Sequence, residues 1–127
     1  MAKSVSIDEL AAEITLAVTQ YTESVSSSIE AEVSRTAKAV QEDIAANSPK
    51  DTGEYSKGWR RKKESGQGRI QYTVHNKSKP SIAHLLENGF ARSGGGRQPG
   101  KPHIRPAYDR YVPTMLQAIE KIIKDGG

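Results

Sequence analysis

Apolar residues recur every three or four positions along the first third of the chain, which is the spacing of one face of a helix. The positions are Ile7, Leu10, Ile14, Val18, Tyr21, Val25, Ile29, Val33, Ala37, Val40 and Ile44. Ser6 can cap the start, with Glu9 three residues later as its capping-box partner. Pro49 ends the pattern, because the residue before a proline disfavours helical angles. The spacing therefore predicts a helix within residues 1–47.

A continuous helix of this length is longer than a small domain can cover. About 40 helical residues span roughly 60 Å. Either part of the apolar stripe contacts another chain, or the helix breaks. The polar stretch Ser24–Ser28 is the expected break, since serines are mediocre helix formers. We favour a stripe that serves both the subunit core and a contact between subunits.

A strand pattern follows a loop over residues 47–58. Ile70, Tyr72 and Val74 alternate with polar residues, which is typical of a half-buried strand. Residues 57–63 are its expected hairpin partner, with a turn over 64–68. That partner carries the run Arg60–Lys63, which puts charge on both faces, and a buried strand does not tolerate this easily. We therefore expect the hairpin to project from the body as an exposed arm.

The last third of the chain predicts two helices separated by a flexible Gly-rich loop over residues 91–101. The first is short, over Ser81–Asn88, with Ser81 as its cap and Gly89 in a left-handed closing position. The second spans 106–124 and starts at Pro106, a residue favoured in the first turn. Pro113 should kink this helix or mark its true start.

The expected fold class is therefore α+β: a long N-terminal helix, a small curved antiparallel sheet with a projecting hairpin, a short helix and a C-terminal helix. At 127 residues we expect one domain, divided into a helix (1–47), sheet and basic loops (48–105) and a closing helix (106–124).

Composition limits what such a domain can do. Only 35% of residues are hydrophobic, with one Phe and one Trp, so the core is thin and neighbouring subunits would add stability. The absence of cysteine excludes disulfides and thiolate zinc sites. No apolar run approaches the roughly 20 residues of a membrane span, and the N-terminus lacks a signal-peptide core. We expect a soluble protein made in the cytoplasm, with no membrane partner.

Charge is distributed unevenly behind a net value of +4. Residues 1–47 carry three basic and eight acidic side chains, residues 48–110 carry fourteen basic and five acidic ones, and residues 111–127 balance. The two halves can attract each other across a subunit contact, the basic half can face a polyanion, or both can be solvated surface.

No arrangement of residues indicates an active site. Gly95–Pro102 nearly spells a phosphate-binding loop, but Pro102 stands where a Ser or Thr must hold magnesium. His84 and Glu87 lie one helical turn apart and could share a metal, yet such a lone pair is more often a surface hydrogen bond. We expect no enzyme, no cofactor and no metal site.

The remaining signal is cationic. The side chains that we expect at an interface or at the lumen of an assembly are Arg60, Arg61, Lys62, Lys63, Arg69, Lys77, Lys79, Arg92, Arg97 and Lys101. Attraction to phosphate needs only charge and reach. Reading bases would need a groove-sized helix with outward Arg or Asn side chains, and none is visible. Any DNA contact is therefore expected to be non-specific.

A set of short motifs occurs in a fixed order along the chain. Pro49 precedes Asp51, Thr52 and Gly53; Ala83 and the segment Leu86–Gly89 follow; then comes Pro102-His103-Ile104-Arg105-Pro106-Ala107. This order resembles a small tail-component family of tailed phages and prophages, whose members are described as neck, head–tail joining or tail-completion proteins. The chain departs from the pattern at Phe90, where relatives often have Thr, and at Glu54-Tyr55.

The resemblance implies a homo-oligomeric ring, six copies preferred and twelve possible, at the head–tail junction of a virion assembled in the host cytoplasm. DNA would pass through this ring, and other neck, connector and tail proteins would adjoin it. The acidic helix of one subunit would meet the basic sheet region of the next. The hairpin at Arg60–Lys63 or the loop Ser93–Lys101 would line the lumen or dock on an adjoining ring.

The motif residues are expected to be structural. Asp51, Thr52 and Gly53 would form a turn, and Glu87 would anchor that turn or pair with Arg105. The last helix would have its entry angle fixed by Pro102, Pro106 and Ala107. Two alternatives stay open: a stand-alone, non-specific DNA-binding module, and a small hydrolase or nuclease.

Overall fold

The computed structural model describes residues 3–7, 11–18, 20–49, 53–64, 66, 68–79 and 82–126. The elements in chain order are β1 (Lys3–Ile7), β2 (Ala11–Ala17), α1 (Glu23–Asn47), α2 (Glu54–Lys57), β3 (Trp59–Lys63), β4 (Arg69–Asn76), α3 (Ala83–Asn88), β5 (Gly89–Ala91), β6 (Arg97–Pro99) and α4 (Ile104–Asp125). The α+β expectation is confirmed.

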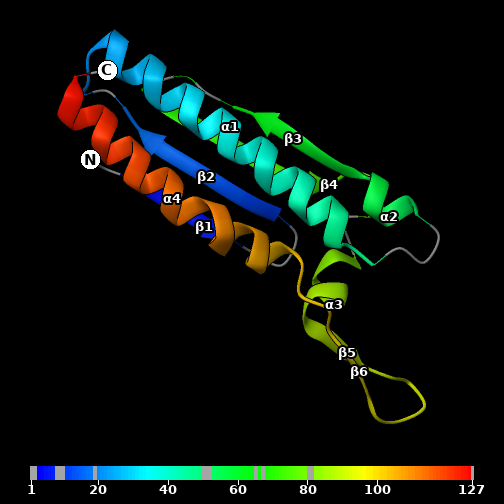
Figure 1. Ribbon diagram of the computed structural model, residues 1–127. Helices are drawn as coiled ribbons and strands as arrows, with labels where there is room; N and C mark the ends of the chain where they lie inside the picture. The colour runs from blue at the N-terminus through cyan, green and yellow to red at the C-terminus, as the bar shows by residue number, and fades with distance from the viewer. Residues whose placement is uncertain are drawn as a thin grey trace.

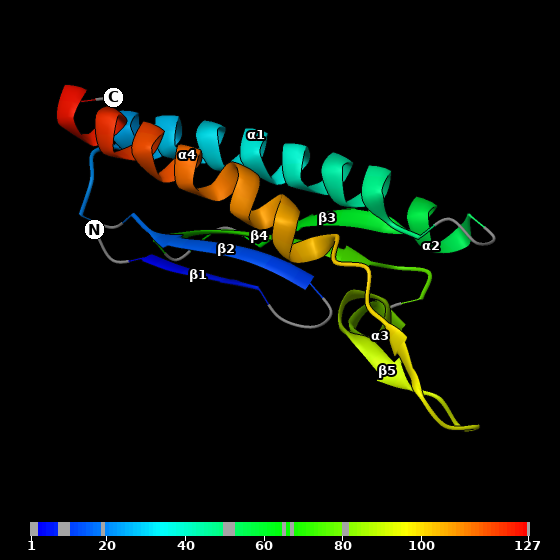
Figure 2. The same ribbon diagram turned by 60° about the horizontal axis from the view of Figure 1, so that its bottom comes forward.

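Two layers make up the body (Figure 1). A four-stranded antiparallel sheet has the order β1-β2-β4-β3. α1 and α4 lie side by side on one face of this sheet, and no described element covers the other face (Figure 2). α3 and the two-stranded β5–β6 sheet stand off from one end of the body.

The covered face of the sheet is apolar at every second residue. Along β4, Ile70, Tyr72 and Val74 are buried, as the alternating pattern predicts. Their partners across the register in β2 are Leu16, Ile14 and Ala12, which are buried as well. Both long helices therefore pack on these two central strands.

α1 begins at Glu23, so the prediction of a helix over the whole of residues 1–47 is wrong in its first part. Thr22 caps it, its hydroxyl accepting a hydrogen bond from the Val25 N–H at 3.2 Å. From there the predicted stripe is buried: Val25, Ile29, Val33, Ala37, Val40 and Ile44. The serines expected to break the helix instead form its first turns, because Thr22 provides a cap just before them.

β3 forms with β4 the expected hairpin, but this hairpin does not project. β3 is an edge strand of the main sheet and lies beside α1. Its charges are tolerated because Arg61 donates to the Gln41 side chain at 2.6 Å and Lys63 pairs with Glu30, both on α1. β3 lies at the edge of the sheet beside polar side chains of α1, so the residues after Trp59 can be charged without being buried.

The projecting hairpin is β5–β6, where a flexible loop was expected. Phe90 faces Gln98 across the register, and Ala91 faces Arg97. We call residues 89–100, from Gly89 to Gly100, the arm. The arm follows α3, whose observed span agrees with the expected short helix; the expected cap, Ser81, lies outside the described residues.

α4 covers the predicted C-terminal helix and starts two residues before Pro106. Pro113 lies inside it, so the alternative that Pro113 marks the helix start is wrong. Pro113 lies on the exposed side of the helix, where its ring does not have to pack against another element. Gly126, at φ 83°, ends the helix and donates its N–H to the Ile122 carbonyl at 3.0 Å. The buried side of α4 consists of Ile104, Ala107, Val112, Met115 and Ile119.

Candidate assembly surfaces

The uncovered face of the main sheet is polar and basic. Residues of β2 and β4 that alternate with the buried ones lie on it, and register places Arg60 opposite His75 and Lys62 opposite Thr73. Its described members are Glu13, Thr15, Arg60, Lys62, Arg69, Gln71, Thr73 and His75. We call this set the open face. It offers three permanent cations and one carboxylate to whatever lies in front of it.

Part of the acidic charge of α1 is paired within the same chain. Asp43 pairs with Arg110 of α4, and Glu32 pairs with Arg35 one helical turn away. The pair of Asp43 with Arg110 joins α1 to α4, and the pair of Glu30 with Lys63 joins α1 to β3. The acidic stretch is therefore less available to a neighbouring subunit than its charge count alone indicates.

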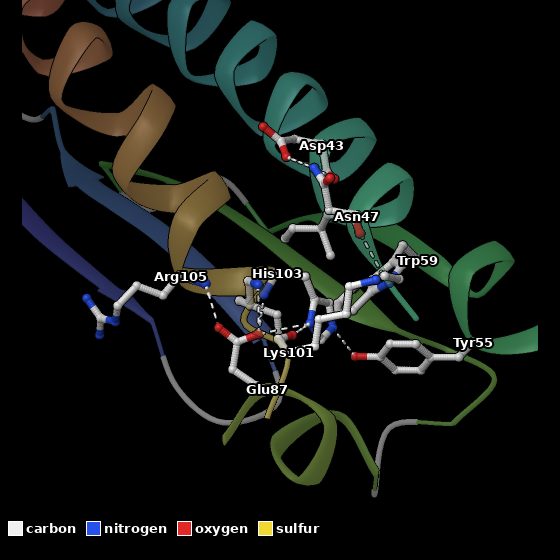
Figure 3. Close-up of polar contacts among 11 residues, drawn as sticks. Asp43, Asn47, Tyr55, Trp59, Glu87, Lys101, His103 and Arg105 are labelled. Atoms are coloured by element: carbon white, nitrogen blue, oxygen red, sulfur yellow. Dashed lines mark hydrogen bonds and ion pairs between the residues drawn. The ribbon is translucent and has the colours of Figure 1, made fainter. Parts of the chain in front are cut away.

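Glu87 holds the start of α4. Its Oε1 accepts hydrogen bonds from the N–H groups of His103 and Ile104 at 2.7 and 2.9 Å, and its Oε2 accepts from the N–H of Arg105 at 3.0 Å (Figure 3). These N–H groups have no partner within the helix, and the N-terminus of a helix attracts negative charge. Glu87 thus acts as a side-chain cap supplied by α3, a different element.

The predicted roles of Glu87 are corrected in detail. It contacts the backbone of Arg105, while the Arg105 guanidinium lies 3.9 Å from Asp109. The turn that it was expected to anchor includes Asp51 and Thr52, which lie outside the described residues.

The surroundings of Glu87 keep it ionised. Burial acts to raise the pKa of this carboxyl, but hydrogen bonds from the His103 ring and from three backbone N–H groups outweigh burial and lower the pKa to about 2. The charge is consistent with the 3.0 Å contact between Oε1 and Nδ1 of His103.

His103 links Glu87 to a cluster of aromatic rings. Its Nδ1 lies 2.8 Å from the Lys101 carbonyl as well as close to Glu87, and both of these groups are acceptors, so Nδ1 carries a proton. Nε2 then accepts from the Tyr55 hydroxyl at 2.7 Å. Burial, together with the charge of Glu87, raises the pKa of Tyr55. The phenol is therefore a hydrogen-bond donor throughout the ordinary pH range.

The three rings of Tyr55, Trp59 and His103 pack edge to face, with centroids 5.5 to 6.1 Å apart. The Trp59 indole N–H donates to the Ser48 hydroxyl at 2.8 Å. Asn76 donates to the Tyr55 carbonyl at 2.7 Å and accepts from the Lys79 N–H at 2.8 Å. We call Tyr55, Trp59, Glu87 and His103 the junction cluster, because it joins α2, β3, α3 and the start of α4.

The junction cluster has the composition of an acid–base triad, but its geometry is structural. The His103 side chain is fully buried, and its ring nitrogens contact Tyr55, Lys101 and Glu87. No group of three or more His, Cys, Asp or Glu able to hold a metal occurs among the described residues. The cluster fixes elements in place, and the elements that it fixes carry the arm.

The arm has a tightly built base. Gly89 ends α3 with φ 84° and donates its N–H to the Leu85 carbonyl. A Cβ on Gly89 would lie 2.5 Å from the Gln98 carbonyl oxygen, and one on Gly100 would lie 2.5 Å from the Glu87 carbonyl oxygen. The Lys101 N–H donates to the Leu86 carbonyl at 2.8 Å. Both glycines are needed because two backbone segments meet there without room for a side chain.

The tip of the arm is cationic. Arg92 and Arg97 are exposed, and the tip between them contains three glycines. The Arg92 guanidinium donates to the Gln98 side chain, and Arg97 donates to the Asn88 carbonyl at 3.0 Å. Phe90, 36% exposed, is the exposed large hydrophobic residue of the described chain.

The remaining predicted residues are spread over these surfaces. Lys77 is exposed, and Lys79 pairs with Glu54 at 3.3 Å. Gly53, at φ 86°, precedes α2, and Pro106 lies in the first turn of α4, beside the fully buried Ala107. Pro49 follows the buried Ser48, and Pro102 is exposed beside Lys101. The ten predicted cations therefore do not form one cluster.

Sequence reasoning missed the junction cluster as a unit. Tyr55 and His103 are 48 positions apart, and Glu87 and the His103 N–H are 16 apart. No local spacing connects such residues. The only indication of this cluster in the sequence was that Glu87, His103 and the aromatic residues Tyr55 and Trp59 all lie within or next to the ordered motifs.

Comparison with known proteins gives one match. Residues 12–89 match the model of a family described as "Bacteriophage HK97-gp10, putative tail-component". No curated protein and no solved structure matches the chain. Across the part of the chain that the structure describes, no helix is both long and apolar enough to span a bilayer.

Proposed function

Because the chain belongs to this phage tail-component family, we propose that it is a structural virion protein that forms a homo-oligomeric ring at the junction of head and tail. Six copies are preferred over twelve. Assembly takes place in the host cytoplasm, and the neighbours are other neck, connector and tail proteins. The family is one of structural components, which agrees with a role that makes and breaks no covalent bonds.

The observation that carries this proposal is the open face. A four-stranded sheet that buries one face under two helices and leaves the other polar suits a wall between protein and water. In a ring, subunits oriented alike would turn the open face toward the channel. The helices α1 and α4 would then form the outer layer.

DNA in such a channel would be contacted through its phosphates. Arg60, Lys62 and Arg69 provide cations, and the Thr73 hydroxyl beside them can donate a hydrogen bond to phosphate. No helix of the described residues stands on this face to enter a major groove. The contact would therefore be independent of base sequence, as passage of a whole genome requires.

Electron microscopy of mature virions of the phage that encodes this chain tests the proposal directly. We expect a ring at the head–tail junction whose subunits fit the α1–α4 and sheet layers, with the sheet toward the DNA. Absence of the chain from the mature virion would overturn the structural role. A ring elsewhere in the tail would overturn its position.

A stand-alone, non-specific DNA-binding module is the second candidate, and the same open face favours it. The two functions differ in their dependence on partners. A module would bind duplex DNA as a monomer, with an affinity that falls steeply as salt rises. A ring subunit would self-associate or associate with tail proteins, and its virions would be incomplete without it.

A further inference from the structure

The arm leaves the body as an oriented element, on the side of the sheet that the helices do not cover. At its base, the Lys101 N–H donates to the Leu86 carbonyl at 2.8 Å, and Glu87 bonds to the first residues of α4. In the view of Figure 2, α1 and α4 lie above the main sheet, whereas the arm extends below one end of it. The arm and the open face are therefore presented to the same side of the molecule.

The arm carries positive charge that is not neutralised within the subunit. Residues 89–101 contain Arg92, Arg97 and Lys101 and no acidic residue, and all three cations are exposed. Among the described residues, none of the three forms an ion pair, whereas cations on several other elements are paired with carboxylates. The arm therefore offers its full charge to an external anion.

The two arginines lie together at the tip of the arm. The register pairs Ala91 with Arg97, so Arg92 follows directly beside this pair. Each guanidinium donates once within the arm or at its base, to the Gln98 side chain or to the Asn88 carbonyl. A guanidinium carries five N–H donors, so most of its donors remain for a further acceptor. Since neighbouring like charges repel, an anion bound in front of the tip would stabilise both arginines.

The composition of the arm favours phosphate over an acidic protein surface. Five of its twelve residues are glycine, and three of these lie at the tip. A specific protein interface has a core of apolar and aromatic side chains, and the arm has one aromatic residue, Phe90, with 36% of its surface exposed. Contact with phosphate needs only charge and reach, and glycines allow the backbone to approach a ligand closely.

We propose that the arm is a second DNA-contacting element, in which Arg92 and Arg97 bind phosphates of the same duplex that lies along the open face. This inference rests on the proposed function, because it takes the open face as the side that faces DNA. Arginine binds phosphate through two parallel N–H···O bonds, and such contacts carry no information about base sequence. A duplex in front of the sheet would thus be contacted along the strands and again beyond their end.

DNA binding by the full-length protein tests the arm contact. The arm variant is R92Q/R97Q, and the control is K121Q/K124Q, which removes the same charge from exposed positions in the last turns of α4. Fluorescence anisotropy of a labelled duplex is followed over a salt series. We expect the arm variant to lose about tenfold in affinity at about 50 mM salt and its salt slope to fall by about 2, with the control within about twofold of wild type. Equal behaviour of the two variants, or no binding by wild type at this salt concentration, would overturn the inference.

Chemical cleavage tests where the DNA lies, because the chain contains no cysteine of its own. An iron–EDTA reagent attached to Ser93→Cys, at the exposed tip, should cleave a bound duplex. The same reagent attached to Thr114→Cys, which is exposed on α4, should leave the duplex intact. Equal cleavage from both positions, or none from Ser93→Cys, would reject the arm as the contacting element.

A labelled polyglutamate peptide tests the other class of partner in the same assay. We expect R92Q/R97Q to lose more affinity for duplex DNA than for the peptide. If it loses binding to the peptide and keeps full affinity for DNA, the partner of the arm is an acidic protein surface and the inference is wrong.

The inference and the proposed function fail in different ways. A ring at the head–tail junction, together with DNA binding that does not depend on Arg92 and Arg97, would reject the arm contact and leave the ring in place. Arm-dependent DNA binding by a chain that forms no ring in the virion would reject the ring and leave a DNA-binding arm.

Discussion

At the scale of single residues, Glu87 has the greatest effect on the fold. It belongs to α3, yet it caps α4 through three backbone N–H groups and contacts the His103 ring. A hydrogen bond contributes more to stability when its acceptor is charged, and a buried N–H group without an acceptor lowers stability. One side chain therefore sets the direction of α4 relative to the arm.

Replacing Glu87 by glutamine tests this role. Glu87→Gln keeps the shape but removes the charge, and we expect a loss of about 1–3 kcal/mol in the free energy of unfolding. Urea denaturation followed by circular dichroism measures it. Glu64→Gln is the matched control, since Glu64 is exposed and pairs with Lys62 on the surface, where little stability is lost. Equal losses would show that capping is unimportant.

Acid should remove the same stabilisation. The pKa of Glu87 lies at about 2 in the folded protein, below the ordinary 4.5. The unfolded chain therefore takes up the proton first, so the contribution is complete above pH 4.5 and is lost as pH falls toward 2. We expect the stability difference between wild type and Glu87→Gln to shrink over this interval in urea titrations at stepped pH. A constant difference would contradict the stabilisation of the charged carboxylate by the hydrogen bonds from the His103 ring and the backbone N–H groups.

At the scale of elements, the spacing of apolar residues predicted the helices and strands that have one buried face. α4, β4 and the part of α1 after Glu23 follow their apolar periods. β2 was missed because Ile14 fits two patterns: the three-to-four spacing with Val18, and the alternation with Ala12 and Leu16. Pairing with β4 decides between them, and that partner lies more than 50 residues away.

The same limit applies to the arm and its base. The glycines of residues 94–96 suggested flexibility, whereas cross-strand pairing at Phe90 and Ala91 orders the hairpin. The junction cluster could not be predicted from the sequence, because Tyr55, Glu87 and His103 come together only when α2, α3 and α4 pack against one another. Residues whose role is to join elements leave no periodic signal in any one element.

The two glycine environments in the arm make a matched pair of predictions. A Cβ on Gly100 would lie 2.5 to 2.7 Å from the backbone of residues 87–89, whereas a Cβ on Gly94 would meet nothing within 4 Å. Gly100→Ala should cost about 1–3 kcal/mol through overpacking and lower the melting temperature. Gly94→Ala should leave melting nearly unchanged. If both variants melt alike, the close contact at the arm's base is not part of the folded structure.

At the scale of the whole molecule, the cations divide according to the side of the sheet on which they lie. Alternation along β3 sends Arg61 and Lys63 to the helix side, where they contact α1, and leaves Arg60 and Lys62 on the open face. The four were predicted as one projecting cationic hairpin. In the structure, Arg61 and Lys63 contact α1, whereas, among the described residues, Arg60 and Lys62 contact only their own hairpin and the residues beside it and are exposed on the open face.

This division leads to opposite outcomes for two variants of equal charge. Arg60→Glu with Lys62→Glu should keep the melting temperature, weaken binding to duplex DNA and reduce the salt slope by about 1 for each phosphate that the variant no longer neutralises. Arg61→Glu with Lys63→Glu should instead place two carboxylates beside Glu30 and Gln41, so melting falls while the open face is intact. Fluorescence anisotropy over a salt series and thermal melting measure the two effects. Should the helix-side variant lose DNA affinity as strongly as the open-face variant while staying folded, the DNA-facing surface would be the edge of β3, and the sheet could not line the channel as proposed.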